Sequence, residues 1–305
     1  MFRGCFMKAH VDETLVEVTR TPVQRVSGLG LAIKRDDLTN PLYGGNKVRK
    51  LAHLLVDARR RHAKRLVTTG AWGSHHALAT ATFGVRAGFD VKLLLVPQPR
   101  TPHVDEVLAA TRQTGAEVVL ARGVAELPLL LARGRARGDA WIPPGGSNEI
   151  GSLGYVEAAA ELAAQIARGE ADEPDEIVLA VGTGGTAAGL AIGLSRAGLR
   201  TKIVGAVVVS PALISRLSTR ALIARLARDP REAWDAERRL TLDASELGGG
   251  YGEPTNAGRR AEAICAREAG VALDLTYTAK AFALALRRKD AGARVLYWHT
   301  LAATR

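Results

Sequence analysis

Short apolar segments that favour strands alternate along this chain with longer segments that favour helices. One such series runs through residues 66–167, and a second follows the acidic loop at 169–176. Alternation of this kind predicts an α/β protein with parallel-rich sheets covered by helices on both faces. The expected strands are 66–69, 91–96, 117–120, 177–181 and 203–209, and the expected helices are 48–59, 74–87, 104–114, 155–167, 186–197, 211–240 and 257–269, the last of them ended by Gly270.

The size and composition are those of a soluble globular protein. The chain has 305 residues, of which 47% are hydrophobic and 24% charged, enough for one large domain or two smaller ones. Apolar runs such as 93–96 are far shorter than the roughly 18–20 residues that a membrane span requires. Residues 1–10 contain no apolar run of signal-peptide type. We therefore expect a cytoplasmic protein without a membrane partner.

The basic charge balance does not point to a nucleic-acid partner. The formal net charge is +11, and 33 of the 42 basic residues are arginines spread over the whole chain. The dense run at 59–65 comes at the end of an expected helix, where cations stabilise the helix dipole, and no nucleic-acid-reading motif is recognisable. The two cysteines, Cys5 and Cys265, form no CxxC or Cys/His cluster, so we expect neither a disulfide framework nor a bound metal.

Four glycine-rich segments interrupt the pattern of strands and helices. Loops of this kind hold ligands in α/β proteins. Taken one at a time, each loop could equally be a simple turn or a helix cap. The four segments are Gly44-Gly45-Asn46-Lys47, Pro144-Gly145-Gly146-Ser147-Asn148, Gly182-Thr183-Gly184-Gly185-Thr186 and Gly248-Gly249-Gly250-Tyr251-Gly252.

The third loop favours a phosphate. It lies between the apolar strand 177–181 and a helix that begins near Thr186, so backbone N–H groups and a helix N-terminus converge on one point. A dinucleotide would also need an acidic residue about 20 positions further on. No Asp or Glu occurs between Glu176 and Asp229, which removes most support for that alternative, and the chain has neither a P-loop nor an HExxH motif.

The first loop places Lys47 at the start of a helix. The positive end of the helix dipole disfavours protonation of an amine held there, so Lys47 could attack a carbonyl and form a Schiff base. The alternative is an ordinary solvated lysine in the first turn of a helix.

Taken together, the loops and their neighbours carry a resemblance to a known family. The matching segments are Arg35-Asp36-Asp37-Leu38, Gly44-Gly45-Asn46-Lys47-Val48-Arg49-Lys50, Gly73-Ser74-His75-His76, Gly145-Gly146-Ser147-Asn148, Gly151-Ser152-Leu153-Gly154-Tyr155, Gly182-Thr183-Gly184-Gly185-Thr186, Gly250-Tyr251-Gly252, Tyr277-Thr278-Ala279-Lys280 and His299-Thr300. In this order they resemble pyridoxal-phosphate enzymes of the 1-aminocyclopropane-1-carboxylate deaminase/D-cysteine desulfhydrase type, over residues 21–300.

The resemblance implies the tryptophan-synthase β-like fold, called fold type II, with two open, parallel-rich, twisted sheets covered by helices. A large cofactor-binding domain is expected to comprise residues 1–48 and 158–305, and a small inserted domain residues 49–157. The cofactor, pyridoxal 5′-phosphate, would lie between the domains. The resemblance also implies a homodimer and a small amino-acid substrate.

Carried over by motif, the resemblance assigns a role to each matching residue. Lys47 would hold the cofactor covalently and move the Cα proton. Ser74, Tyr251 and Tyr277 would be catalytic, with Ser74 orienting the substrate carboxylate or acting as nucleophile and the tyrosines assisting proton transfer. The further cofactor-binding residues would be Asn46, His75, Gly182, Thr183, Gly184, Gly185, Thr186 and Thr300, with Thr300 at the pyridine nitrogen. The substrate-binding residues would be Ser74, His76, Tyr251 and Thr278.

Two positions depart from the family pattern. His75 replaces the asparagine expected beside the 3′-oxygen of the cofactor, and an imidazole there could titrate near neutrality. Leu301-Ala302 replace two glycines. Thr278 stands where cyclopropane deaminases have glutamate and D-cysteine desulfhydrases have threonine.

These assignments favour a pyridoxal-phosphate lyase that releases sulfide, pyruvate and ammonia from D-cysteine. The alternatives are a 1-aminocyclopropane-1-carboxylate deaminase and a pyridoxal-phosphate-binding protein with little catalysis.

Overall fold

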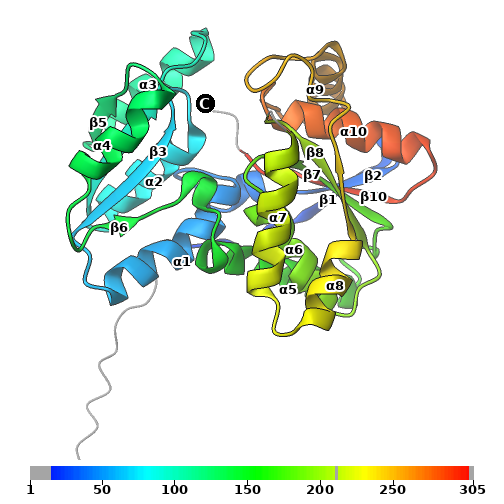
Figure 1. The fold of residues 1–305 in the computed structure, drawn as a ribbon. Helices are drawn as coiled ribbons and strands as arrows, with labels where there is room; N and C mark the ends of the chain where they lie inside the picture. The colour runs from blue at the N-terminus through cyan, green and yellow to red at the C-terminus, as the bar shows by residue number, and fades with distance from the viewer. Residues whose placement is uncertain (1–14, 210–211, 302–305) are drawn as a thin grey trace, which may run out of the picture.

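Two sheets flanked by helices form the protein in the computed structural model, which describes residues 15–209 and 212–301 (Figure 1). The larger sheet has the strand order β1-β2-β10-β7-β8-β9, in which only the β1–β2 pair is antiparallel. Its strands are β1 (Val23–Val26), β2 (Leu31–Lys34), β7 (Glu176–Val181), β8 (Lys202–Val207), β9 (Leu240–Asp243) and β10 (Val295–Trp298).

The smaller sheet has the order β5-β4-β3-β6, with every neighbouring pair parallel. Its strands are β3 (Arg65–Ala71), β4 (Asp90–Val96), β5 (Glu117–Leu120) and β6 (Ala140–Trp141). All four lie inside the segment 49–157 expected to form the small domain. The exact domain boundaries stay a prediction, because α5 (Glu149–Ala167) runs through the expected boundary at 157 without a break.

The helices cover the faces of both sheets (Figure 1). Besides α5 they are α1 (Asn46–Arg60), α2 (His75–Arg86), α3 (Pro102–Gln113), α4 (Leu127–Gly134), α6 (Gly185–Arg196), α7 (Ala212–Leu226), α8 (Pro230–Arg238), α9 (Asn256–Ala269) and α10 (Thr278–Asp290). The expected α/β architecture is thus confirmed. Every strand and helix expected from the alternating pattern is present, with differences of a few residues at the ends except at 155–167 and 211–240.

Those two expectations need correction. The helix expected at 155–167 begins six residues earlier, because Asn148 caps its N-terminus by accepting a hydrogen bond from the Gly151 N–H group. The segment 211–240 is two helices, since Asp229 caps a new helix that starts at Pro230, and Leu240 already belongs to β9. Residues 1–10, Cys5, Pro211 and Ala302 lie outside the described residues.

Helices α5 and α6 pack closely because small residues line their contact. Each residue of α6 from Gly185 to Leu194 is buried, and α5 crosses it at short range. A Cβ at Gly189 would lie 2.4 Å from the Ser152 carbonyl oxygen, so only glycine permits this approach. This packing fixes the N-terminus of α6 at the end of β7.

A fully buried carboxylate, that of Asp36, joins several elements. It pairs with the Arg49 guanidinium of α1 at 2.9 Å, and it accepts hydrogen bonds from the Tyr155 hydroxyl of α5 and the Trp298 indole of β10, both at 2.7 Å. Arg49 also pairs with Glu161 of α5 at 3.0 Å. Although burial alone would raise the pKa of Asp36, Arg49 and the two ring donors hold it below its usual value.

Within the described residues, no helix is long and apolar enough to span a membrane. The same residues contain no cluster of three or more His, Cys, Asp or Glu side chains arranged to bind a metal ion.

Replacing Asp36 by Asn should lower the free energy of unfolding by about 3–5 kcal/mol, because Arg49 then remains buried without its main counter-charge. Urea unfolding measures the change. Asp172→Asn is the control, since that side chain is 80% exposed beside Arg25 and its pair should contribute no more than about 1 kcal/mol. Equal losses in the two variants would contradict the account.

Candidate active site

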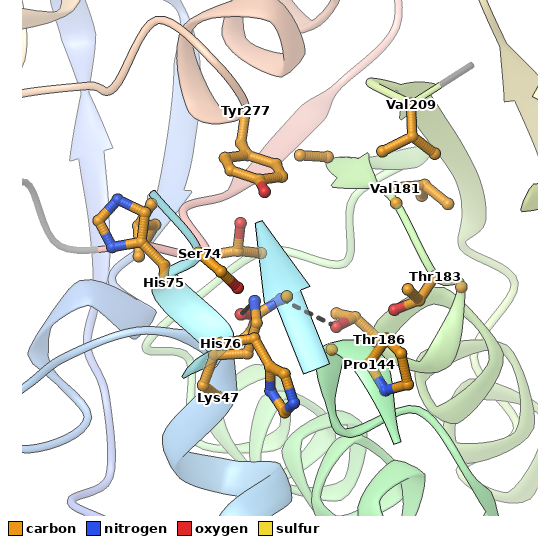
Figure 2. A pocket seen from close by; sticks show the side chains of 18 of the residues that line it. Lys47, Ser74, His75, His76, Pro144, Val181, Thr183, Thr186, Val209 and Tyr277 are labelled. Atoms are coloured by element: carbon orange, nitrogen blue, oxygen red, sulfur yellow. Dashed lines mark hydrogen bonds between the residues drawn. The ribbon is translucent and has the colours of Figure 1, made fainter. Parts of the chain in front are cut away.

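A cavity of about 370 Å³ lies at the carboxyl ends of β3 and β7. All four glycine-rich loops contribute to its wall, with Lys47, Gly145, Gly182 and Tyr251 among the lining residues. Figure 2 shows Lys47, Ser74, Thr186 and Tyr277 around this space. Loops that could each be a simple turn therefore surround a single pocket.

Lys47 is the second residue of α1, and its side chain reaches the pocket. Its Nζ atom donates a hydrogen bond to the Asn46 side-chain oxygen at 2.6 Å. Burial lowers the pKa of Lys47 from 10.5 to about 8, while the Asp274 carboxylate opposes the change. An appreciable fraction of this amine is therefore neutral near pH 7.5 and able to attack a carbonyl group. Its lowered pKa comes chiefly from burial, not from the helix dipole alone.

The loop that precedes Lys47 is fixed to the end of the chain. The Asn46 N–H group donates to the Thr300 carbonyl oxygen at 2.7 Å, and Gly45 forms a β-bridge with Leu301. The Asn46 side-chain amide donates to the Thr186 hydroxyl at 3.1 Å. These contacts place the first loop, the third loop and the end of β10 in one frame, and Thr300 lines the pocket.

The third loop has the form of an anion site. Gly182, Thr183, Gly184 and Thr186 line the pocket at the N-terminus of α6, whereas Gly185 lies just behind them. None of the backbone N–H groups of residues 183–187 bonds to another described residue. These free donors, together with the helix dipole, suit a phosphate group.

Lys50 joins the same site, although no local sequence signal identifies it as a site residue. Its side chain is 2% exposed and lines the pocket, and Nζ donates to the Gly145 carbonyl and the Ser147 hydroxyl, both at 3.1 Å. A Cβ at Gly185 would lie 3.1 Å from Nζ, which places the amine beside the third loop. Burial, with the charge of Lys47, lowers the pKa of Lys50. A bound phosphate would supply the missing counter-charge.

Ser74 and His76 meet the pocket from α2. Ser74 lines it and also caps the helix, since its hydroxyl accepts from the Ala77 N–H group at 3.2 Å. His76 contacts the Thr68 hydroxyl through Nε2 at 2.9 Å, and its buried Nδ1 atom has no partner among the described residues. Burial lowers the pKa of His76 to about 3, so the ring is neutral. Both residues lie where the sequence predicts, while their roles stay predictions.

His75 behaves differently from the expectation. Its Nδ1 atom lies 2.7 Å from the Tyr43 hydroxyl, and its Nε2 atom lies 3.0 Å from Nε2 of His103. Figure 2 places its ring across the pocket from Thr183 and Thr186. Both ring nitrogens therefore have protein partners in this structure, while His75 also lines the pocket. Its role at the cofactor stays a prediction. Burial lowers the pKa of His75 to about 4, so the expected titration near neutrality is wrong.

Two tyrosines face the pocket as a pair. The hydroxyls of Tyr251 and Tyr277 lie 2.6 Å apart, and both residues line the cavity. Thr278, expected to bind substrate, does not line it: the side chain is fully buried, and its hydroxyl donates to the Asp274 carboxylate. Thr278 therefore supports the start of α10 behind Tyr277.

Comparison with known proteins agrees with this geometry. A family model described as pyridoxal-phosphate dependent enzyme matches residues 15–300. The chain is 35% identical to a D-cysteine desulfhydrase of Klebsiella pneumoniae (strain 342), covering 90% of this chain and 87% of that protein. It is 34% identical to a D-cysteine desulfhydrase of Yersinia pestis (strain Pestoides F), covering 86% and 84%.

A solved structure agrees as well. The crystal structure of an ACC deaminase homologue, 30% identical in sequence, superposes with a TM-score of 0.77 and covers 94% of this chain and 91% of that one. The family resemblance and the type II fold inferred from the motifs are thus confirmed.

Replacing Lys50 by Met should weaken the binding of pyridoxal phosphate about tenfold to a hundredfold, because a charge-assisted hydrogen bond contributes about 1.5–3 kcal/mol. Absorbance titration of the cofactor-free protein measures the affinity. Pyridoxal, which lacks the phosphate, should bind the variant and the wild type equally. Lys64→Met, at an exposed position, is the matched control. A similar loss for pyridoxal would show that Lys50 does not act on the phosphate.

Proposed function

The chain belongs to the family of pyridoxal-phosphate dependent enzymes, and we propose that it is a lyase that converts D-cysteine to sulfide, pyruvate and ammonia. The observation that carries this proposal is the buried amine of Lys47, whose pKa is lowered to about 8, in a pocket with an anion site on one side and a tyrosine pair on the other. A small amino acid fits a cavity of this size once the cofactor occupies the phosphate end.

The residues present fit pyridoxal phosphate. The free N–H groups of residues 183–187 and the buried amine of Lys50 supply donors for its phosphate, while Lys47 supplies the amine for its aldehyde. Thr300 would meet the pyridine nitrogen with a neutral hydroxyl, which does not force that nitrogen to stay protonated. When bound, the cofactor withdraws electrons from the substrate Cα atom, and a moderate electron sink favours elimination over transamination.

Lys47 serves as the base in this proposal. With a pKa of about 8, its amine can accept the proton from the substrate Cα atom near neutral pH and later return one. Ser74, at the N-terminus of α2, orients the substrate carboxylate, which the positive end of that helix also attracts. His76 completes this side of the pocket as a neutral ring.

The tyrosine pair would stabilise the leaving group through a hydroxyl group. Burial raises the pKa of Tyr251 and of Tyr277, so both hydroxyls keep their protons near neutral pH. One hydroxyl donates to the other across 2.6 Å, which leaves a single O–H group to point at the substrate. That group can donate a hydrogen bond to a departing thiolate.

The choice of D-cysteine over the cyclopropane substrate rests on charge as well as on the names of the relatives. Among the described residues that line the cavity, none is Asp or Glu. Ring opening calls for a charged acceptor that tunes a tyrosine, whereas sulfide leaves readily once the Cα proton is gone. Thr278 adds no charge, and its hydroxyl is committed to Asp274. Cyclopropane deamination is therefore the second candidate.

The proposal extends to the organisation of the protein. We infer that residues 1–48 and 158–305 form the cofactor-binding domain, that 49–157 form the small domain, and that the enzyme is a homodimer in the cytoplasm. The two sheets support the division, and the family resemblance supports the dimer. Light scattering of the purified protein measures its mass.

The purified enzyme should release pyruvate from D-cysteine and from β-chloro-D-alanine, and little or no 2-oxobutyrate from 1-aminocyclopropane-1-carboxylate. Lactate dehydrogenase coupling measures pyruvate, and Lys47→Ala is the inactive control. Efficient ring opening without D-cysteine turnover would favour the deaminase. Cofactor binding without turnover of either substrate would favour a pyridoxal-phosphate-binding protein.

A further inference from the structure

The loop that carries Tyr251 has weak bonds of its own. It lies between β9 and α9, and the backbone of Gly250 has a φ of 132°, a conformation that favours glycine. Around Tyr251, at residues 247–253, its internal backbone bonds are from the Gly250 N–H group to the Leu247 carbonyl at 3.3 Å and from the Glu253 N–H group to the Gly250 carbonyl at 3.4 Å. Both distances are beyond the usual range of N–H···O hydrogen bonds. The loop therefore needs support from elsewhere.

That support comes from Lys280 of α10. Its side chain is fully buried, and Nζ donates to the Leu247 carbonyl at 2.8 Å and to the Gly250 carbonyl at 3.0 Å. These are the two carbonyls that the loop's own N–H groups reach poorly. One ammonium group thus bridges the loop just before Tyr251.

The position of Lys280 near Tyr277 means that the start of α10 contacts the loop at two places. Lys280 lies in the first turn of α10, three residues after Tyr277, the residue that precedes the helix as its N-cap. The start of α10 therefore contacts the loop twice, through Lys280 at Gly250 and through the Tyr277 hydroxyl at the Tyr251 hydroxyl. The first contact holds the backbone just before Tyr251, and the second holds the Tyr251 hydroxyl.

The burial of this charge favours a specific role over simple packing. No carboxylate forms an ion pair with Lys280 among the described residues, although Glu246, Glu253 and Asp274 are near enough to favour its charged form. Burial outweighs them and lowers the pKa of Lys280. An apolar side chain would fill this space without the cost of removing a charged amine from water. However, an apolar side chain could not donate hydrogen bonds to the two carbonyl groups.

We propose that Lys280 is a positioning residue that holds the loop 247–251 against α10, so that the Tyr251 hydroxyl stays bonded to the Tyr277 hydroxyl in the active site. The effect of Lys280 on turnover rests on the function proposed above for the tyrosine pair. The effect of Lys280 on the conformation of the loop is independent of that function.

The first experiment measures the loop directly. Hydrogen exchange of the holoenzyme, followed by mass spectrometry, reports on the peptide that contains residues 247–252. Lys280→Met should speed exchange of these amides about tenfold or more, because two hydrogen bonds are lost. Lys289→Met, at a half-exposed position near the end of α10 beside Asp290, should leave exchange of the 247–252 peptide unchanged. Unchanged exchange in Lys280→Met would overturn the proposal whatever the substrate proves to be.

The second experiment asks whether Lys280 acts through Tyr251. With D-cysteine, Lys280→Met should lower kcat about tenfold in the wild-type background and less than about twofold in the Tyr251→Phe background, since coupled residues are not additive. Equal losses in both backgrounds would contradict a positioning role, although D-cysteine turnover itself would stand. Lys280→Gln repeats both experiments with a shorter donor. Loss of cofactor binding by both variants would show that Lys280 is needed for folding and would also overturn the proposal.

Discussion

The buried ion pair between Asp36 and Arg49 is the contact on which the geometry of the active site depends. A carboxylate without solvent is costly, and here a guanidinium, an indole and a phenol together offset that cost. Because Arg49 lies two residues after Lys47, and Trp298 lies two residues before Thr300, the same carboxylate anchors both segments that bring these residues to the pocket. Removing the charge would therefore disturb catalysis as well as stability.

Much of the fold could be predicted from the sequence, because its strongest signals are local. The strand 177–181 is an uninterrupted apolar run, and Gly270 ends its helix in a left-handed conformation, as a C-terminal glycine should. The start of α5 was missed because Gly151 and Gly154 interrupt the helical pattern. These glycines are required by tertiary packing: a Cβ at Gly154 would lie 2.2 Å from the Arg49 carbonyl oxygen. Only the assembled structure reveals that constraint.

In the active site, too, some residues could be predicted from local sequence motifs and others only from the folded structure. Lys47, the third glycine loop and the tyrosine pair could be predicted, since each lies in a distinctive motif. The contribution of Lys50 could not, because an amphipathic helix carries many lysines and only the fold shows which one is buried. The sequence places His75 at the pocket, but it gives no sign of the contact between its ring and His103, because no local pattern connects the two residues. Contacts between residues far apart in sequence become visible only in the folded structure.

The central claim is that Lys47, and not its neighbour Lys50, carries the cofactor. Both amines are buried in one pocket with a lowered pKa, but the Lys50 amine donates to the second glycine loop, at the Gly145 carbonyl and the Ser147 hydroxyl. Borohydride reduction of the holoenzyme, followed by proteolysis and fragmentation of the labelled peptide in a mass spectrometer, identifies the lysine. The account predicts that the reduced cofactor is found on Lys47. A label on Lys50, on any other lysine or on none would contradict it.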